Sequence, residues 1–112
     1  MLKFEVFQIQ LTKEQIDEVN SSEGQRPAFY EKYLNVTWKP TKEAIAAARD
    51  MFSKVAEIEA QNLNQVFEIG NVGPESRITR LAPMHSVSVG DVIVHKGNAF
   101  VVAPMGFDRV EF

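Results

Sequence analysis

The carboxyl-terminal part of the chain holds residue types that hydrolytic enzymes use. Two histidines, two serines and an aspartate lie within eleven residues: His85, Ser86, Ser88, Asp91 and His95. A serine nucleophile needs a base within hydrogen-bond reach and an oxyanion hole. The segment lacks the Gly-x-Ser-x-Gly turn that exposes such a serine. We therefore interpret Gly90 and Asp91 as a turn before a strand, with the aspartate binding backbone amides.

The same residues could form a metal site, since imidazole and carboxylate are ligands of zinc and iron. The chain has only 2 histidines and no cysteine, and His95 is expected beside a hairpin turn. The 6 glycines are scattered and match no phosphate-binding loop. The sequence therefore predicts no metal, no other cofactor and no catalytic residue. A small enzyme that uses His85 and Asp91 is kept as the last of three functional hypotheses.

The elements that would position these residues form one α+β domain over residues 1–112. We expect a mainly antiparallel sheet with a carboxyl-terminal β meander and about four helices packed mostly on one face. The expected strands are 2–11, 54–59, 92–95, 98–103 and 107–112, with another around Ile78. The expected helices are 13–19, one that follows Pro27, one that follows Thr41, and one between Asn62 and Gly70.

Local signals define several of these boundaries. Thr12 is an N-cap with Gln15 at the third helical position, the pattern of a capping box. Gly70 has the place of a residue that ends the helix begun at Asn62. Lys96 and Gly97 form a plausible two-residue hairpin turn. The apolar residues of 2–11 change parity midway, which predicts a bulge or a strand covered on both sides.

Composition excludes several functions. The formal net charge is −3, which argues against a strong nucleic-acid binder and against an anionic membrane surface as partner. No apolar run approaches the roughly 20 residues of a membrane-spanning helix. The first ten residues do not resemble a secretory leader, so we expect a cytoplasmic location. Without cysteine, disulfides and thiolate chemistry are excluded.

Aromatic residues mark two surfaces that we expect to mediate interactions. The first consists of Tyr30, Tyr33 and Trp38, since tyrosine and tryptophan are enriched at protein interfaces. The second consists of Phe107 and Phe112 in the last strand. Two phenylalanines so near the chain end favour burial of this strand, against the protein's own helices or across a two-fold homodimer interface. Of these two arrangements the dimer is favoured.

The segment from about residue 52 to residue 112 resembles a family of small proteins carried by phages and mobile elements, including YodL-like modules. The resemblance rests on three stretches, Lys54 to Glu59, Asn62 to Asn71 and the HSVSVGDVI run from His85 to Ile93, followed by Gly106-Phe107. It implies a phage-related origin but carries no catalytic or ligand residue. Gly90 and Asp91, with the two serines, suit a turn that starts the central hairpin.

We therefore expect a non-enzymatic accessory protein that acts through a protein partner or through itself. The alternative from another class is a nucleic-acid-binding module, because Val89 to Val94 also resembles the strand entry of PUA-like and SH3-like barrels. In that case four basic residues should form one positive patch: Arg77, Arg80, Lys96 and Arg109.

Overall fold

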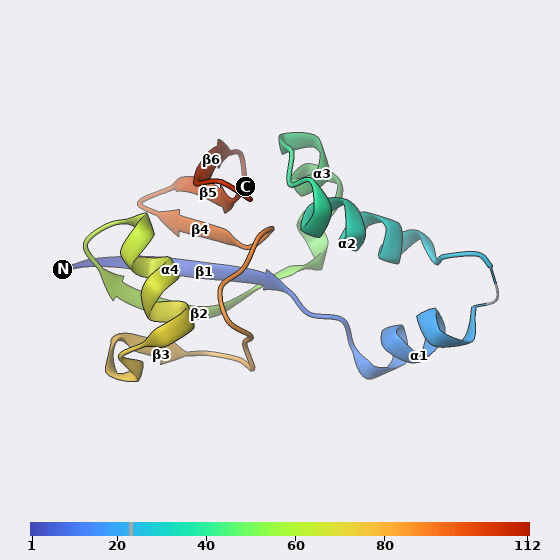
Figure 1. The fold of residues 1–112 in the computed structure, drawn as a ribbon, viewed down its shortest axis with the longest axis horizontal. Coiled ribbons are helices and arrows are strands. Elements are labelled where there is room, and N and C mark those ends of the chain that lie inside the picture. Colours follow the sequence, from blue (N-terminus) through green and yellow to red (C-terminus); the bar gives the residue numbers. More distant parts are fainter. Residues whose placement is uncertain (23) are drawn as a thin grey trace.

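The computed structural model describes residues 1–22 and 24–112 (Figure 1). Six antiparallel strands form one sheet in the order β3-β2-β1-β4-β5-β6. The strands are β1 (Leu2–Ile9), β2 (Phe52–Ala60), β3 (Ile78–Arg80), β4 (Val92–His95), β5 (Asn98–Val102) and β6 (Phe107–Val110). The helices are α1 (Lys13–Ser21), α2 (Ala28–Trp38), α3 (Lys42–Ala47) and α4 (Leu63–Val72), with 3₁₀ turns at Arg49–Met51 and Glu75–Arg77. The α+β fold class is confirmed.

The central strand β1 contains the bulge that its parity change predicts. Its register with β2 shifts between Val6 and Phe7. Before the shift, Phe4 and Val6 enter one hydrophobic cluster, and after it Ile9 enters another. The bulge thus lets one strand supply apolar side chains to both faces of the sheet.

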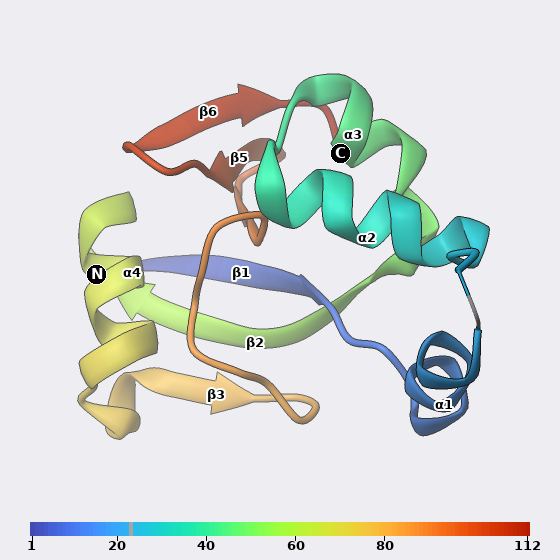
Figure 2. The same ribbon diagram turned by 45° about the vertical axis from the view of Figure 1, so that its right-hand side comes forward.

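The two hydrophobic clusters lie on opposite faces, because successive residues of β4 alternate between them. Ile93 joins the cluster that contains Val66 and Ile69 of α4. Val92 joins the cluster that contains Val36 of α2, together with Ile45 of α3. Figure 2 shows α4 and the α2–α3 pair at opposite ends of the sheet. The helices are therefore divided between the faces, not gathered mostly on one, because a two-sided strand such as β1 needs cover on both sides.

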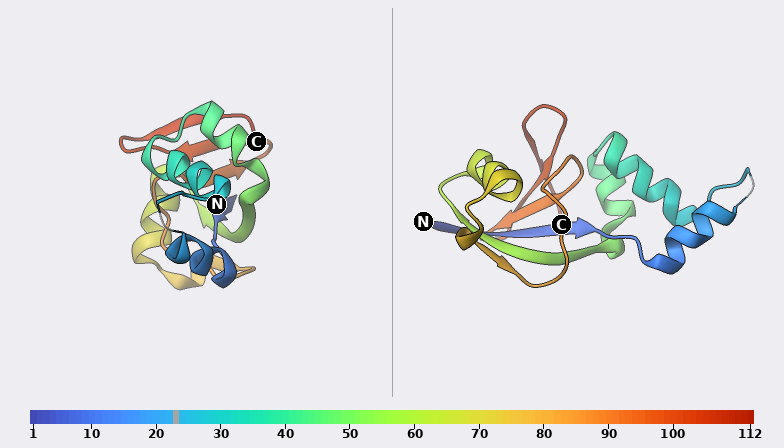
Figure 3. Two further views of the ribbon diagram at one scale, coloured as in Figure 1. Left: turned by 90° about the vertical axis from the view of Figure 1, so that its right-hand side faces the viewer. Right: turned by 60° about the horizontal axis from the view of Figure 1, so that its bottom comes forward.

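The first helix stands apart from both clusters. Within Lys13–Ser21 no residue is buried. Figure 3 shows α1 beside α2, beyond the end of the sheet and away from α4. Its start has the expected capping box: Thr12 Oγ1 accepts from the Gln15 amide, and Gln15 Oε1 accepts from the Thr12 amide. The cap fixes where α1 begins, although tertiary packing does not bury it.

Helix α4 starts at the predicted cap but ends later than predicted. Asn62 Oδ1 accepts from the Gln65 amide. The helix then continues through Gly70 to Val72, and Gly73 follows with φ 105°. A Cβ on Gly70 would lie 2.3 Å from Cγ2 of Val87. The prediction that Gly70 ends the helix is therefore wrong: this glycine is where the segment before β4 crosses the helix closely.

The carboxyl-terminal meander follows the prediction. Lys96 and Gly97 connect β4 to β5 with φ values of 50° and 80°, as a tight hairpin turn requires. β6 forms one edge of the sheet and the short β3 forms the other. None of the helices in the described residues has the length and apolarity needed to cross a membrane.

Candidate functional site

The segment from His85 to Asp91 is fixed to the central strand by a buried glutamine. Gln8 is fully buried, and its Nε2 donates to Asp91 Oδ2 at 2.9 Å and to the His85 carbonyl oxygen at 2.9 Å. Gln8 Oε1 accepts from the His85 amide at 3.2 Å. Asp91 Oδ2 also accepts from the Ser88 amide at 2.9 Å. The carboxylate therefore has the predicted role of a turn residue, with Gln8 as an additional partner.

The Asp91 carboxyl has an unusual acidity. Burial raises its pKa to about 6, while the Ser88 amide, the nearby His85 ring and the Gln8 amide each act in the opposite direction. Burial of a carboxyl group destabilises its charged form, and hydrogen bonds to the carboxylate offset part of that effect. The pKa of Asp91 inside the fold is therefore about 6 instead of 3.8.

Gly90 and Ser88, in the segment from His85 to Asp91, also belong to this turn. Gly90 has φ 96°, and a Cβ there would lie 3.0 Å from Cγ1 of Val36. Its amide donates to the Val102 carbonyl at 2.8 Å. The side chains of Ser86 and Ser88 are exposed, and Ser88 contributes its backbone to the turn. The segment is therefore a structural junction between α2, β1 and β5.

His85 and Asp91 do not form an acid–base pair with each other. The imidazole Nδ1 lies 2.8 Å from the Ser86 carbonyl oxygen, whereas the carboxylate bonds Gln8 and Ser88. Both residues line a cavity of about 40 Å³ beside α2. That volume holds roughly one water molecule and no substrate.

His95 lies in a different part of the molecule from the other two proposed metal ligands. Its Nδ1 lies 2.9 Å from the Lys3 carbonyl oxygen, and its ring stacks on Phe4 with centroids 4.8 Å apart. Within residues 1–22 and 24–112 no group of three acidic or histidine side chains is placed to hold a metal ion. Because a carbonyl oxygen only accepts, this contact requires a proton on Nδ1 of His95.

Three of the predicted interaction residues lie on α2. Trp38, its last residue, has an exposed fraction of 84%. The rings of Tyr30 and Tyr33 stack with centroids 6.0 Å apart, and both side chains are half-buried. Tyr33 packs against the cluster that contains Val36. Of the three predicted residues, Trp38 is exposed, Tyr33 packs against the core and Tyr30 stacks on Tyr33.

The other two predicted interaction residues have partners within the chain. Phe112 packs edge-on against Phe7 at 4.9 Å and against Phe52 at 5.2 Å between centroids. The guanidinium of Arg49 lies 3.7 Å from the centre of the Phe112 ring. Phe107 packs against the cluster beneath α4. Burial against the chain's own residues is therefore the arrangement observed for Phe112, and the homodimer stays a prediction.

Sequence reasoning missed an apolar hollow between α4 and the β4–β5 hairpin. Its volume is about 550 Å³, within the usual range of small-molecule sites. Five apolar side chains form its walls, and a histidine with four amides surrounds them: Leu2, Phe4, Leu63, Phe100, Phe107, His95, Gln61, Asn62, Asn64 and Asn98. We call this set the aromatic hollow.

The aromatic hollow exists because α4 is too small to cover its side of the sheet. A helix is roughly 10 Å across and strands lie roughly 4.8 Å apart, so one helix covers two or three of six strands. α4 lies over β2 and leaves the side chains of Phe100 and Phe107 only half-buried. The alternation of the last two strands could have indicated the hollow. Phe100 and Phe107 fall on the strand face opposite Val101 and Val110, and no second helix covers the face that carries the two phenylalanines.

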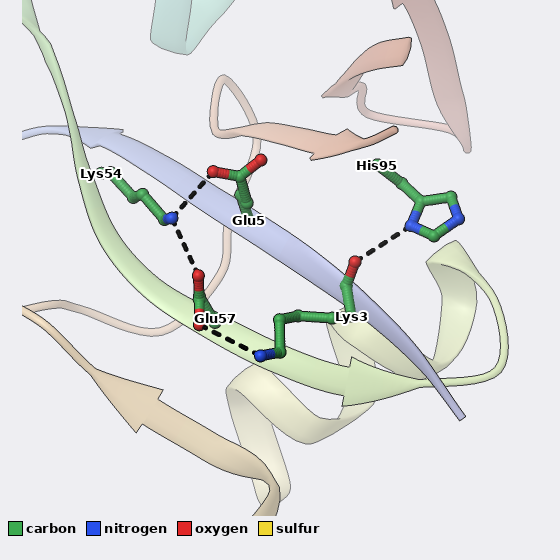
Figure 4. A network of polar contacts seen from close by, with 5 residues as sticks. All are labelled: Lys3, Glu5, Lys54, Glu57 and His95. Carbon is green, nitrogen blue, oxygen red and sulfur yellow. Dashed lines mark hydrogen bonds and ion pairs between the residues drawn. The ribbon is translucent and has the colours of Figure 1, made fainter. Parts of the chain in front are cut away.

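The uncovered part of the opposite face has a different chemistry. There Lys54 Nζ lies 2.8 Å from Glu5 Oε2 and 2.9 Å from Glu57 Oε2, between two carboxylates that are paired across β1 and β2 (Figure 4). Hydrogen bonds that Lys54 donates to Glu5 and Glu57 raise the pKa of Lys54, and the bond to Glu57 lowers the pKa of that carboxyl group. Charged side chains are the normal surface of an uncovered sheet face. The aromatic hollow departs from that pattern.

The four basic residues that a nucleic-acid interface would need do not form one patch. Arg80 pairs with Glu75 at the β3 edge, and Arg77 lies near the same edge. Arg109 lies on β6 at the opposite edge and Lys96 in the β4–β5 turn. The strands do not bring the four basic residues together, because four strands lie between β3 and β6 in the sheet.

Comparison of the chain with family models, with curated proteins and with solved structures gives no match.

Proposed function

We propose that this chain is a non-enzymatic accessory protein of a phage or mobile element and that it acts by binding a protein partner. Trp38 carries the proposal. Its side chain is 84% exposed at the end of α2. Val36, two residues earlier in the same helix, is 1% exposed in the core. The Trp38 side chain is therefore exposed to solvent on a helix that is anchored in the core through Val36.

An exposed tryptophan supports binding for energetic reasons. Burying a large aromatic side chain removes much apolar surface from water, at roughly 25 cal/mol per Å². Tryptophan and tyrosine are also the residues on which binding energy concentrates at protein interfaces. The stacked pair of Tyr30 and Tyr33 lies on the same helix, with both side chains half-buried.

Binding is favoured over catalysis by the state of the reactive side chains. Asp91 is held by Gln8 and the Ser88 amide, and His85 Nδ1 contacts the Ser86 carbonyl oxygen, so the two side chains do not pair. The cavity that both residues line holds roughly one water molecule, and the larger cavity of about 250 Å³ that His85 also lines does not include Asp91. Nucleic-acid binding is the weaker alternative because the basic residues are spread over two sheet edges. A filter-binding titration at two salt concentrations separates it: phosphate contacts give an affinity that falls steeply with salt.

The experiment compares three immobilised proteins in a bacterial lysate: the wild type, Trp38→Ala and Met105→Ala. Met105 has an exposed fraction of 92% in the β5–β6 connection and controls for loss of any exposed apolar side chain. We expect a partner retained by the wild type and by Met105→Ala. With the purified partner, Trp38→Ala should weaken binding at least tenfold, about 1.4 kcal/mol. Equal retention by Trp38→Ala, or no retained protein at all, would overturn the proposal.

A further inference from the structure

A cation, Arg109, stands at the rim of the aromatic hollow. Arg109 Nη2 donates to Asn98 Oδ1 at 2.7 Å, and the Arg109 guanidinium lies 5.8 Å from the centre of the Phe100 ring. Asn98 and Phe100 both line the hollow, so Arg109 stands at its edge. The guanidinium keeps further N–H donors beyond the one used on Asn98.

No carboxylate balances this cation among the described residues that line the hollow. The adjacent acidic residue of β6, Asp108, is paired with Val101, whose side chain belongs to the opposite face. Glu111 lies against α3, beside Lys42 and Glu43. The hollow therefore combines apolar walls, amide groups and one guanidinium.

We propose that the aromatic hollow binds a small planar aromatic molecule that carries an acidic group. The rings of Phe4, Phe100 and Phe107 provide the apolar surface for its ring system, at edge-on or offset-stacked geometry. Arg109 binds the acidic group with its remaining N–H donors. This site is separate from α2, the helix of Trp38, because Phe4 and Phe107 belong to the cluster on one face of the sheet and Val36 of α2 to the cluster on the other.

The volume supports a small molecule as the occupant. A hollow of about 550 Å³ accommodates a ligand of two or three fused or linked rings. Asn98 is already held by Arg109, and the stacked pair of Phe4 and His95 is held by the Lys3 carbonyl. These contacts exist before any ligand enters, so little ordering is needed on binding.

The test uses two probes that share one ring system. 8-Anilinonaphthalene-1-sulfonate is an aromatic anion, and N-phenyl-1-naphthylamine has the same rings without the sulfonate. Isothermal titration calorimetry with the full chain should show one saturable site, with the sulfonate bound more tightly. Arg109→Gln should weaken the sulfonate about fivefold and leave the neutral compound unchanged. Arg77→Gln, the same change of charge at the opposite sheet edge, should alter neither affinity.

A second pair of variants tests the location. Asn64 is exposed and lines the hollow, so Asn64→Trp fills it without removing a core side chain. It should weaken both probes at least tenfold, while the matched Asn35→Trp on α2 should weaken neither. Absence of saturable binding by the wild type, unchanged binding by Asn64→Trp, or equal losses of both probes in Arg109→Gln would each overturn the assignment. None of these outcomes alters the Trp38 result.

Discussion

Gln8 Nε2 donates a buried hydrogen bond of 2.9 Å to Asp91 Oδ2, across 83 positions of sequence. The bond ties the central strand β1 to the turn that precedes β4. Both side chains have little contact with water, with exposed fractions of 0% and 4%. Their pairing therefore affects both the stability of the fold and its dependence on pH.

The first prediction concerns pH. The pKa of Asp91 rises from 3.8 to about 6 on folding, so the folded state binds this proton more tightly than the unfolded state. Asp91 therefore stabilises the fold below pH ~4, and the contribution is lost as the pH rises through about 6. A shift of this size corresponds to on the order of 3 kcal/mol.

Asp91→Asn should remove this dependence, since an amide does not titrate. Urea unfolding at pH 4, 5, 6 and 7 measures it. The difference in free energy of unfolding between the variant and the wild type should grow in favour of the variant as the pH rises. Exposed carboxylates contribute equally to both proteins and cancel in the difference. Parallel stability curves would contradict the prediction.

The second prediction concerns Gln8 itself. Gln8→Leu removes three hydrogen bonds and leaves the Asp91 carboxylate and the His85 backbone without these partners. Unsatisfied buried polar groups cost about 1–3 kcal/mol each, so the variant should lose at least 2 kcal/mol of unfolding free energy. Gln10→Leu is the control, because Gln10 is exposed and bonds the same segment at Pro83.

The double variant Gln8→Leu/Asp91→Leu tests whether the two side chains stabilise the fold as a hydrogen-bonded pair or independently. When both partners become apolar, no charge is left buried alone, and the double variant should be more stable than the sum of the single losses implies. Chemical denaturation of the four proteins in the cycle gives the coupling energy. Additive losses would show that the two side chains do not act as a pair.

The third prediction concerns the crossing of α4 by the segment before β4. Gly70→Ala should destabilise the protein by roughly 1–3 kcal/mol, because its Cβ would enter the space of Val87. Alanine otherwise favours a helix interior by about 1 kcal/mol over glycine. Adding Val87→Ala should recover part of the loss, and thermal melts of the three variants test this. If Gly70→Ala were more stable than the wild type, the contact between α4 and Val87 would have room for an additional methyl group.

The fourth prediction concerns the chain end. Phe112→Ala removes contacts with Phe7, Phe52 and the Arg49 guanidinium. The loss should be about 2 kcal/mol, or a decrease of several degrees in melting temperature. All three contacts lie within one chain, so the sedimentation coefficient should not change. A shift from dimer to monomer in Phe112→Ala would instead support the homodimer that the sequence favoured.

Local sequence signals predicted much of the fold because local geometry produces it. The Thr12 cap, the Lys96-Gly97 turn and the parity change of β1 each depend on a few neighbouring residues. Gly70 was misread because a glycine that ends a helix and one that admits a neighbouring chain look alike in sequence. The Val87 methyl group that separates the two cases lies 17 positions away.

The candidate sites were less predictable for a related reason. The turn role of Asp91 could be predicted, but a glutamine in an apolar strand gives no sign that it will meet that aspartate. The aromatic hollow depends on how far α4 reaches across the sheet. That reach follows from tertiary packing, which no short window of sequence contains.

The central place of β1 also governs when the fold can form. Among the described strands β1 is synthesised first, and it pairs with β2 on one side and with Val92 to Val94 of β4 on the other. Contacts so distant in sequence slow folding, because a long loop must close before they contribute. On the ribosome, one edge of β1 therefore stays unpaired until nearly the whole described chain has emerged. Folding is delayed until the last strands are made.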